Sequence, residues 1–84
     1  MRVRVSSRFL RKAKKLKEPQ ASMLRAALRR LSADPRDPVL GSHRLHGELA
    51  DYWACTVDRD LRLLFRWTSD ELDLVNLGSH DQVD

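Results

Sequence analysis

The sequence predicts an α+β fold with the element order βααβββ, in which an N-terminal hairpin of two helices packs on a small antiparallel sheet. The first half of the chain holds two amphipathic patterns of helical period, separated by Pro19. The second half alternates apolar and polar residues with a period of two, interrupted by short polar turns. The 84 residues contain no repeat, low-complexity tract or linker, so we expect a single domain over residues 1–84.

A strand and a first helix are expected at the start of the chain. Residues 2–5 alternate arginine and valine, which is typical of a short strand. Ser6 and Ser7 offer side-chain oxygens that can cap a helix running to about Lys17. The expected apolar stripe of this helix consists of Phe9, Leu10, Ala13 and Leu16.

The second helix is expected over residues 20–33. Pro19 stops the preceding helix and can occupy the first position of this one, where the N–H that proline lacks would have no helical partner. Asp34 and Pro35 end the helix, because the residue before a proline is disfavoured in the helical region. The expected apolar face consists of Leu24, Ala27, Leu28 and Leu31.

Three strands are expected in the second half of the chain, over residues 52–57, 61–67 and 72–77. The polar turns between them, at residues 58–60 and 68–70, are short enough to make neighbouring strands antiparallel. One face of this meander is apolar and needs the helices as a cover.

The net charge of +4 conceals an uneven distribution. Residues 1–47 hold 13 Lys and Arg against 3 Asp and Glu, a net +10, whereas residues 48–84 hold 3 against 9, a net −6. Five cations and no acid occupy residues 11–17, and such a run repels itself unless a polyanion or an acidic partner lies against it. Nucleic acid is the natural polyanion, so we expect Lys12 and Lys15 to contact its phosphates. The alternatives are a solvated helix face and an acidic protein partner.

The chain is expected to be cytoplasmic. No apolar run approaches the roughly 20 residues of a membrane span, and no apolar segment follows the basic start as it would in a signal peptide. The single cysteine, Cys55, lies in an apolar stretch. This is typical of a small core residue in a reducing compartment, rather than of a disulfide or a nucleophile.

The sequence holds three histidines, His43, His46 and His80, and histidine is the residue type whose ordinary pKa lies nearest to neutral pH. The first two are close enough in sequence to ligate a metal, but a catalytic metal needs a third ligand that the sequence does not place. We therefore expect no metal and no other cofactor. His46, beside Gly47, is interpreted as a solvated loop residue.

Another grouping favours metal-free cleavage of RNA. His43 precedes the three strands, Asp60 lies in the first turn, Arg62 lies on the polar face of the next strand and His80 follows the last. Cleavage needs a base for the 2′-OH proton, an acid for the leaving 5′-oxygen and a cation on the phosphate. Two histidines and an arginine supply these groups, and Asp60 can orient a histidine or act as the base. The alternative is that Asp60 and Arg62 are ordinary turn and surface residues.

Four segments resemble the RelE/ParE superfamily of bacterial toxins, in particular its YafQ-like and RelE/StbE branch. They are HRLHG at 43–47, YWACTV at 52–57, DLRLLF at 60–65 and LGSHD at 77–81. Residues 9–16 and 28–35 also resemble the first helix and the end of the second helix of that family. The likeness therefore spans nearly the whole chain.

The resemblance implies a type II toxin that acts as a metal-independent, ribosome-dependent endoribonuclease on messenger RNA. It also implies a cognate antitoxin, with which the toxin can form a hetero-oligomer. The implied catalytic set is His43, Asp60 and His80, with Arg62 as the phosphate contact, and we expect Arg66 to extend this basic surface toward RNA. The alternatives are a ParE-like inhibitor of DNA gyrase, which needs no acid–base groups, and a catalytically decayed toxin that only binds its antitoxin.

Two positions depart from the YafQ-like pattern. Thr56 stands where those enzymes carry a further histidine, and Asp84 stands where a Tyr or Phe usually contacts the RNA. An acid at the latter position repels phosphate and removes a stacking surface. Three interpretations remain open: reduced activity, a substitute stacking surface from Tyr52 or Trp53, or a decayed toxin.

Overall fold

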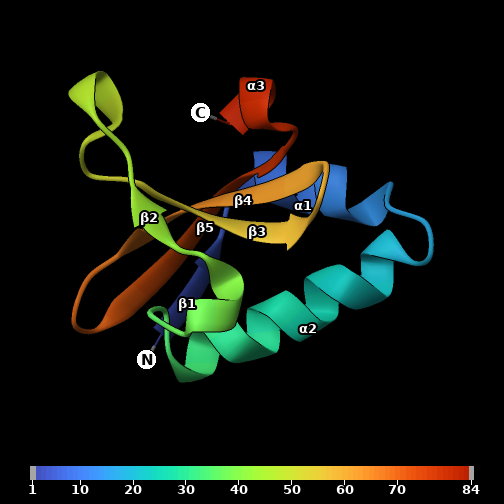
Figure 1. Cartoon of the computed structure of the whole chain (residues 1–84), viewed down its shortest axis with the longest axis horizontal. Coiled ribbons are helices and arrows are strands. Elements are labelled where there is room, and N and C mark those ends of the chain that lie inside the picture. Colours follow the sequence, from blue (N-terminus) through green and yellow to red (C-terminus); the bar gives the residue numbers. More distant parts are fainter. Residues whose placement is uncertain (1, 84) are drawn as a thin grey trace.

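The computed structural model describes residues 2–83 and confirms the α+β class (Figure 1). A helical layer lies against one face of a five-stranded sheet. The elements are, in chain order, β1 (Arg2–Val5), α1 (Ser7–Lys14), α2 (Gln20–Ala33), the 3-10 turn η1 (Pro38–Leu40), β2 (His43–Arg44), the 3-10 turn η2 (Gly47–Leu49), β3 (Trp53–Asp58), β4 (Leu61–Trp67), β5 (Glu71–Gly78) and α3 (His80–Val83).

The strand order in the sheet is β1-β5-β4-β3-β2. The predicted meander of β3, β4 and β5 is antiparallel, as expected. The prediction of a wholly antiparallel sheet is wrong for β1, which pairs with β5 in parallel, with Arg2 opposite Glu71 and Val5 opposite Leu74. A parallel neighbour needs a long connection, which the helices and the meander provide. The sheet is therefore mixed.

Helix α2 has the bounds that the sequence predicts. Pro19 immediately precedes it and Asp34 caps its end. The preceding helix α1 begins as predicted, because the Ser6 Oγ accepts a hydrogen bond from the N–H of Phe9 at 3.0 Å. It ends at Lys14 rather than near Lys17, since the chain tightens there into hydrogen bonds to carbonyls three residues back.

The main core lies between the helices and the sheet, where α1 covers β5 and α2 covers β3. Leu10 is 46% exposed, so its predicted place on the apolar stripe of α1 is wrong. The other three predicted residues, Phe9, Ala13 and Leu16, do pack in or against the core. The buried residues of this cluster are Phe9, Leu24, Ala27, Leu31, Leu40, Cys55, Val57, Leu61, Leu63, Phe65, Leu72, Leu74 and Leu77.

A second, smaller core covers the middle of the opposite face of the sheet. It joins Leu45, Ala54, Leu64 and Val83, with α3 and the segment before β3 as its cover. Alternation along the strands predicted Ala54 and Leu64 for a polar face, yet both are buried. Two elements too short for a periodic signal, β2 and α3, were not predicted. No helix within residues 2–83 is long and apolar enough to span a bilayer.

The two leucines on the helices provide a matched test of this packing. Leu31 is fully buried and Leu10 is largely exposed. Leu31→Ala is expected to lower the free energy of unfolding by about 2–5 kcal/mol, because it leaves a cavity in the main core. Leu10→Ala is expected to change it by less than about 0.5 kcal/mol. Urea unfolding followed by circular dichroism measures both, and equal losses would contradict this placement of α1.

Cys55 provides a second test. Burial raises the pKa of its thiol to about 12, so almost no thiolate forms in the folded protein at pH 8. We expect a disulfide reagent such as DTNB to react slowly with the native protein and at once in urea. The pKa in the unfolded chain is near 9.0, so the neutral buried thiol stabilises the fold below pH 9 and this contribution declines as the pH rises toward 12. Rapid labelling under native conditions would show that the site opens.

Candidate active site

The pairing of β3, β4 and β5 aligns three residues in one row across the end of the sheet. Arg62 of β4 lies between Thr56 of β3 and Gly78 of β5, each its direct partner. The neighbours of Arg62 on its own strand, Leu61 and Leu63, pack into the main core. Since side chains alternate along a strand, Arg62 projects from the face opposite the helices.

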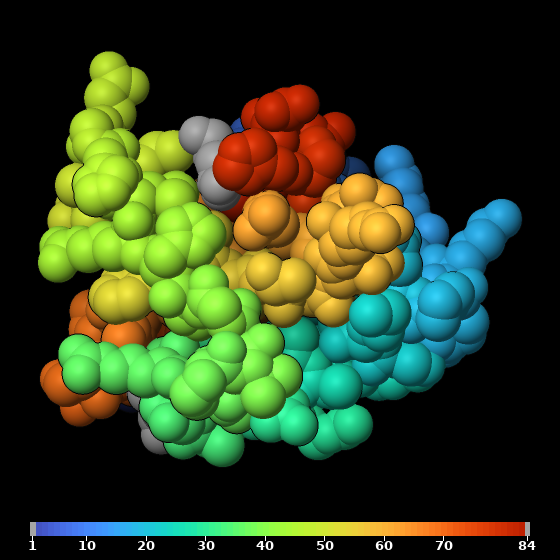
Figure 2. Space-filling model, viewed as in Figure 1, coloured from blue at the N-terminus to red at the C-terminus, as the bar shows by residue number. Residues whose placement is uncertain are grey.

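The other predicted residues surround this row. Asp60 lies in the turn two residues before Arg62, and His80 follows Gly78 by two residues. His43, at the start of β2, pairs with Ala54, two residues from Thr56 on β3. Figure 2 shows the C-terminal segment, in red, lying against the amber residues around the β3–β4 turn. The fold thus brings Asp60, Arg62 and His80 to the same end of the sheet, whereas His43 lies beside the middle of the sheet, at the row where Ala54 pairs with Leu64.

Arg62 is half-buried at this end of the sheet. Within the described part of the chain, no carboxylate forms an ion pair with it. By contrast, Arg4 pairs with Glu71 at 3.4 Å and Arg30 with Asp37 at 3.1 Å. A guanidinium without a carboxylate partner retains its charge and its donors for a phosphate.

His80 is held by a capping box at the start of α3. The Ser79 Oγ accepts a hydrogen bond from the N–H of Gln82 at 3.3 Å, and the Gln82 Oε1 accepts one from the N–H of Ser79 at 3.0 Å. At the end of the helix, Val83 is buried in the smaller core. A Cβ at Gly78 would collide with the Gln82 side chain, so the last residue of β5 must be glycine for this cap to close.

His43 is held by β2 and by the turn before it. Its Nδ1 lies 3.3 Å from the carbonyl oxygen of Gly41, a residue in the left-handed region at φ 59°. In the tautomer that donates this hydrogen bond, Nε2 carries no proton, which is the form that a general base requires. Both His43 and His80 are exposed, as is Asp60.

Lys12 ties the basic helix α1 to the same end of the sheet. Its Nζ donates a hydrogen bond of 2.9 Å to the Oδ1 of Asn76, a buried residue two positions before Gly78. Lys15 is exposed, as are the cations beside it. Arg66 lies elsewhere, at the other end of β4, where its guanidinium stacks over the ring of Tyr52 at 5.6 Å.

Trp53, considered as a substitute surface for stacking on an RNA base, does not lie beside Arg62. Trp53 packs against the main core on the helix side, whereas Arg62 lies on the opposite face. Tyr52 is on the correct face but lies opposite the far end of β4, with Arg66 over its ring. Asp84, the residue in the place of the usual aromatic, lies outside the described residues.

Across residues 2–83, no three His, Cys, Asp or Glu side chains gather closely enough to hold a metal ion. His46 is exposed at the start of η2, a position compatible with the interpretation as a loop residue. Sequence reasoning missed α3 although its signal was present, since Ser79 and Gln82 have the S-x-x-Q spacing of a capping box.

The helical layer on one face of the mixed sheet is the fold of solved toxins of the RelE type. YafQ from Escherichia coli superposes with a TM-score of 0.80 at 20% identity, over 98% of this chain and 97% of that one. The YoeB/ParE toxin from Agrobacterium tumefaciens gives a TM-score of 0.80 at 15% identity, over 95% and 99%. The toxin–antitoxin complex RelBE2 from Mycobacterium tuberculosis gives 0.74 at 23%, over 94% and 96%.

The chain belongs to the YafQ family. The model of this family, described as the bacterial toxin of a type II toxin-antitoxin system, YafQ, matches residues 1–84. Comparison with proteins of curated function gave no significant match. The resemblance stated from the four sequence segments is therefore confirmed, and with it a toxin whose partner is a cognate antitoxin.

The capping box can be tested apart from any activity. Gln82→Ala removes the acceptor for the Ser79 N–H and is expected to loosen α3, because a lost cap costs about 0.5–2 kcal/mol. Gln82→Glu keeps an acceptor in the same place and is expected to leave α3 intact. Hydrogen exchange at the Val83 amide measures the difference. Unchanged protection in Gln82→Ala would show that burial of Val83 alone holds the helix.

Proposed function

We propose that this toxin is a metal-independent endoribonuclease that cuts messenger RNA on the ribosome. The observation that carries the proposal is the grouping of His80, Asp60 and the Arg62 guanidinium at one end of the sheet, with His43 at the edge of the sheet two residues along β3 from that row. The family and the fold support it, because both belong to bacterial toxins.

The proposed reaction is an attack of the RNA 2′-oxygen on the adjacent phosphorus. A base removes the 2′-OH proton, a P–O bond forms to the 2′-oxygen, and the bond to the 5′-oxygen breaks as an acid protonates that oxygen. His43 and His80 share these two proton transfers, and Asp60 orients a histidine or supplies the base. Arg62 binds the phosphate and stabilises the charge that builds on it. The products are a 2′,3′-cyclic phosphate and a free 5′-hydroxyl.

Docking on the ribosome is assigned to α1. Its exposed cations lie at the end of the sheet that carries Arg62, because Lys12 fixes the helix to Asn76. Phosphate contacts of this kind release counterions, so the association is expected to weaken steeply with salt. Among these cations, Lys15 is expected to contact a phosphate of ribosomal RNA. The cognate antitoxin, with acidic groups opposite the same cations, would compete for this surface.

The central test uses matched histidine variants. The chain is induced in bacterial cells without its antitoxin, and mRNA 5′ ends are mapped. Cuts at codon-related positions are expected with the parent chain. They are expected to fall by about 100-fold or more in His80→Ala, since loss of a general acid or base costs a factor of that order. His46→Ala is the control, because this histidine lies outside the proposed site, and it should cut like the parent.

Other outcomes would contradict the proposal in different ways. Growth arrest without cuts, with DNA breaks dependent on gyrase, would indicate a ParE-like inhibitor. The absence of arrest together with retained antitoxin binding would indicate a catalytically silent toxin. Equal cutting by the parent and by His80→Ala would remove His80 from the site.

A further inference from the structure

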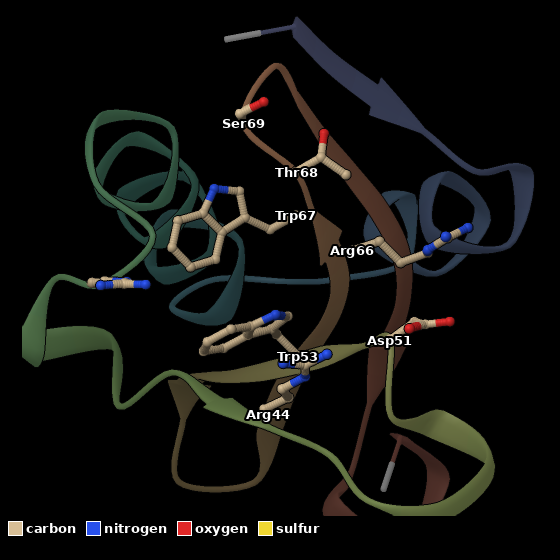
Figure 3. Close-up of a pocket in the computed structure, with 8 residues that line it drawn as sticks. Arg44, Asp51, Trp53, Arg66, Trp67, Thr68 and Ser69 are labelled. Atoms are coloured by element: carbon tan, nitrogen blue, oxygen red, sulfur yellow. The ribbon is translucent and has the colours of Figure 1, made fainter.

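A pocket of about 440 Å³ opens at the end of the sheet opposite the candidate active site (Figure 3). It lies where β3 begins and β4 ends, and Trp67 is five residues, or about 17 Å, from Arg62 along β4. Its volume lies within the range of small-molecule sites, about 300–1,000 Å³. The lining residues are Arg36, Arg44, Asp51, Trp53, Arg66, Trp67, Thr68 and Ser69.

Two indoles form the aromatic part of this pocket. Figure 3 shows Trp53 and Trp67 reaching into the same space from adjacent strands. Their ring centroids are 5.2 Å apart with an interplanar angle of 65°, an edge-to-face arrangement, and both side chains are only half-buried. The guanidinium of Arg36 lies 5.3 Å from the ring centroid of Trp67. Planar surfaces and a cation are therefore adjacent.

The lining contains three arginines and one carboxylate, and the guanidinium of one of the arginines, Arg66, lies over the ring of Tyr52. Within residues 2–83, none of Arg36, Arg44 and Arg66 forms an ion pair, although four other arginines of the chain do. The Nε of Arg44 donates a hydrogen bond of 2.9 Å to the carbonyl oxygen of Ala50, which fixes the group and uses one of its five donors. The pocket therefore has an excess of positive charge that nothing in the described chain neutralises.

We infer that this pocket binds a nucleotide of single-stranded RNA, with the phosphate on Arg36 and Arg44 and the base against Trp53 and Trp67. Arginine forks match phosphate oxygens, and aromatic faces stack on any base. An acidic peptide would use the arginines alone and leave the two indoles without a partner. The choice of RNA rests on the proposed function. Because the pocket is far from Arg62, its nucleotide is remote from the bond that is cut.

Tryptophan fluorescence reports on this pocket without background, because the only two tryptophans of the chain both line it. Uridine and adenosine 5′-monophosphate are expected to quench the emission, and inorganic phosphate is expected to compete. Calorimetry gives the Kd. The double variant Arg36→Gln with Arg44→Gln should raise the Kd by at least about fivefold. Arg44→Lys keeps the positive charge but loses the forked guanidinium, so its Kd should lie between those of the parent and the double variant.

Arg29→Gln is the matched control, since Arg29 is an exposed arginine of α2 outside the pocket. It should bind nucleotides like the parent, and so should His80→Ala. Nucleotide binding by a chain that cuts no RNA would leave this inference standing while the proposed reaction failed. No saturable quenching by either nucleotide, or equal quenching by tetraglutamate, would overturn the inference; the latter would assign the pocket to an acidic partner protein.

Discussion

The pairing of β4 with its two neighbours is the constraint on which the rest of the structure depends. One face of β4 carries Leu63 and Phe65, both fully buried under the helices, and the other carries Arg62 near one end and Arg66 near the other. A register shift of one residue would exchange the two faces and place the arginines in the core. The same hydrogen bonds that build the sheet therefore separate two cationic positions by most of the length of a strand.

The small core on the second face links the fold to the candidate active site. A helix of four residues has almost no stability of its own, so α3 exists because Val83 is buried beside Ala54 and Leu64 and because its first turn is capped. His80 begins that helix. Apolar packing on the middle of the sheet thus helps to set its position relative to Arg62.

The charges of the two halves of the chain are partly matched in space. Because β1 lies beside β5, Arg2 and Arg4 approach Glu71 at 4.0 and 3.4 Å, and Arg4 lies 3.9 Å from Asp73. These pairs are exposed and contribute little to stability. Their effect is on the distribution of charge: they pair the arginines of β1 with two acids of β5, while the cations of α1 form no ion pair within the described residues.

The sequence by itself determined those features that neighbouring residues encode. The bounds of α2 follow from a helical pattern between Pro19 and Asp34, and those of β4 from an apolar residue at every second position between two turns. The approach of Asp60, Arg62 and His80 to one end of the sheet was also predictable, since consecutive antiparallel strands return the chain to the same end of the sheet. Only the tertiary structure decided the parallel pairing of β1, the exposure of Leu10, the burial of both sheet faces and the pocket around Trp53. Each of these depends on segments distant in sequence, and the period of a local pattern does not specify which distant segment it will meet.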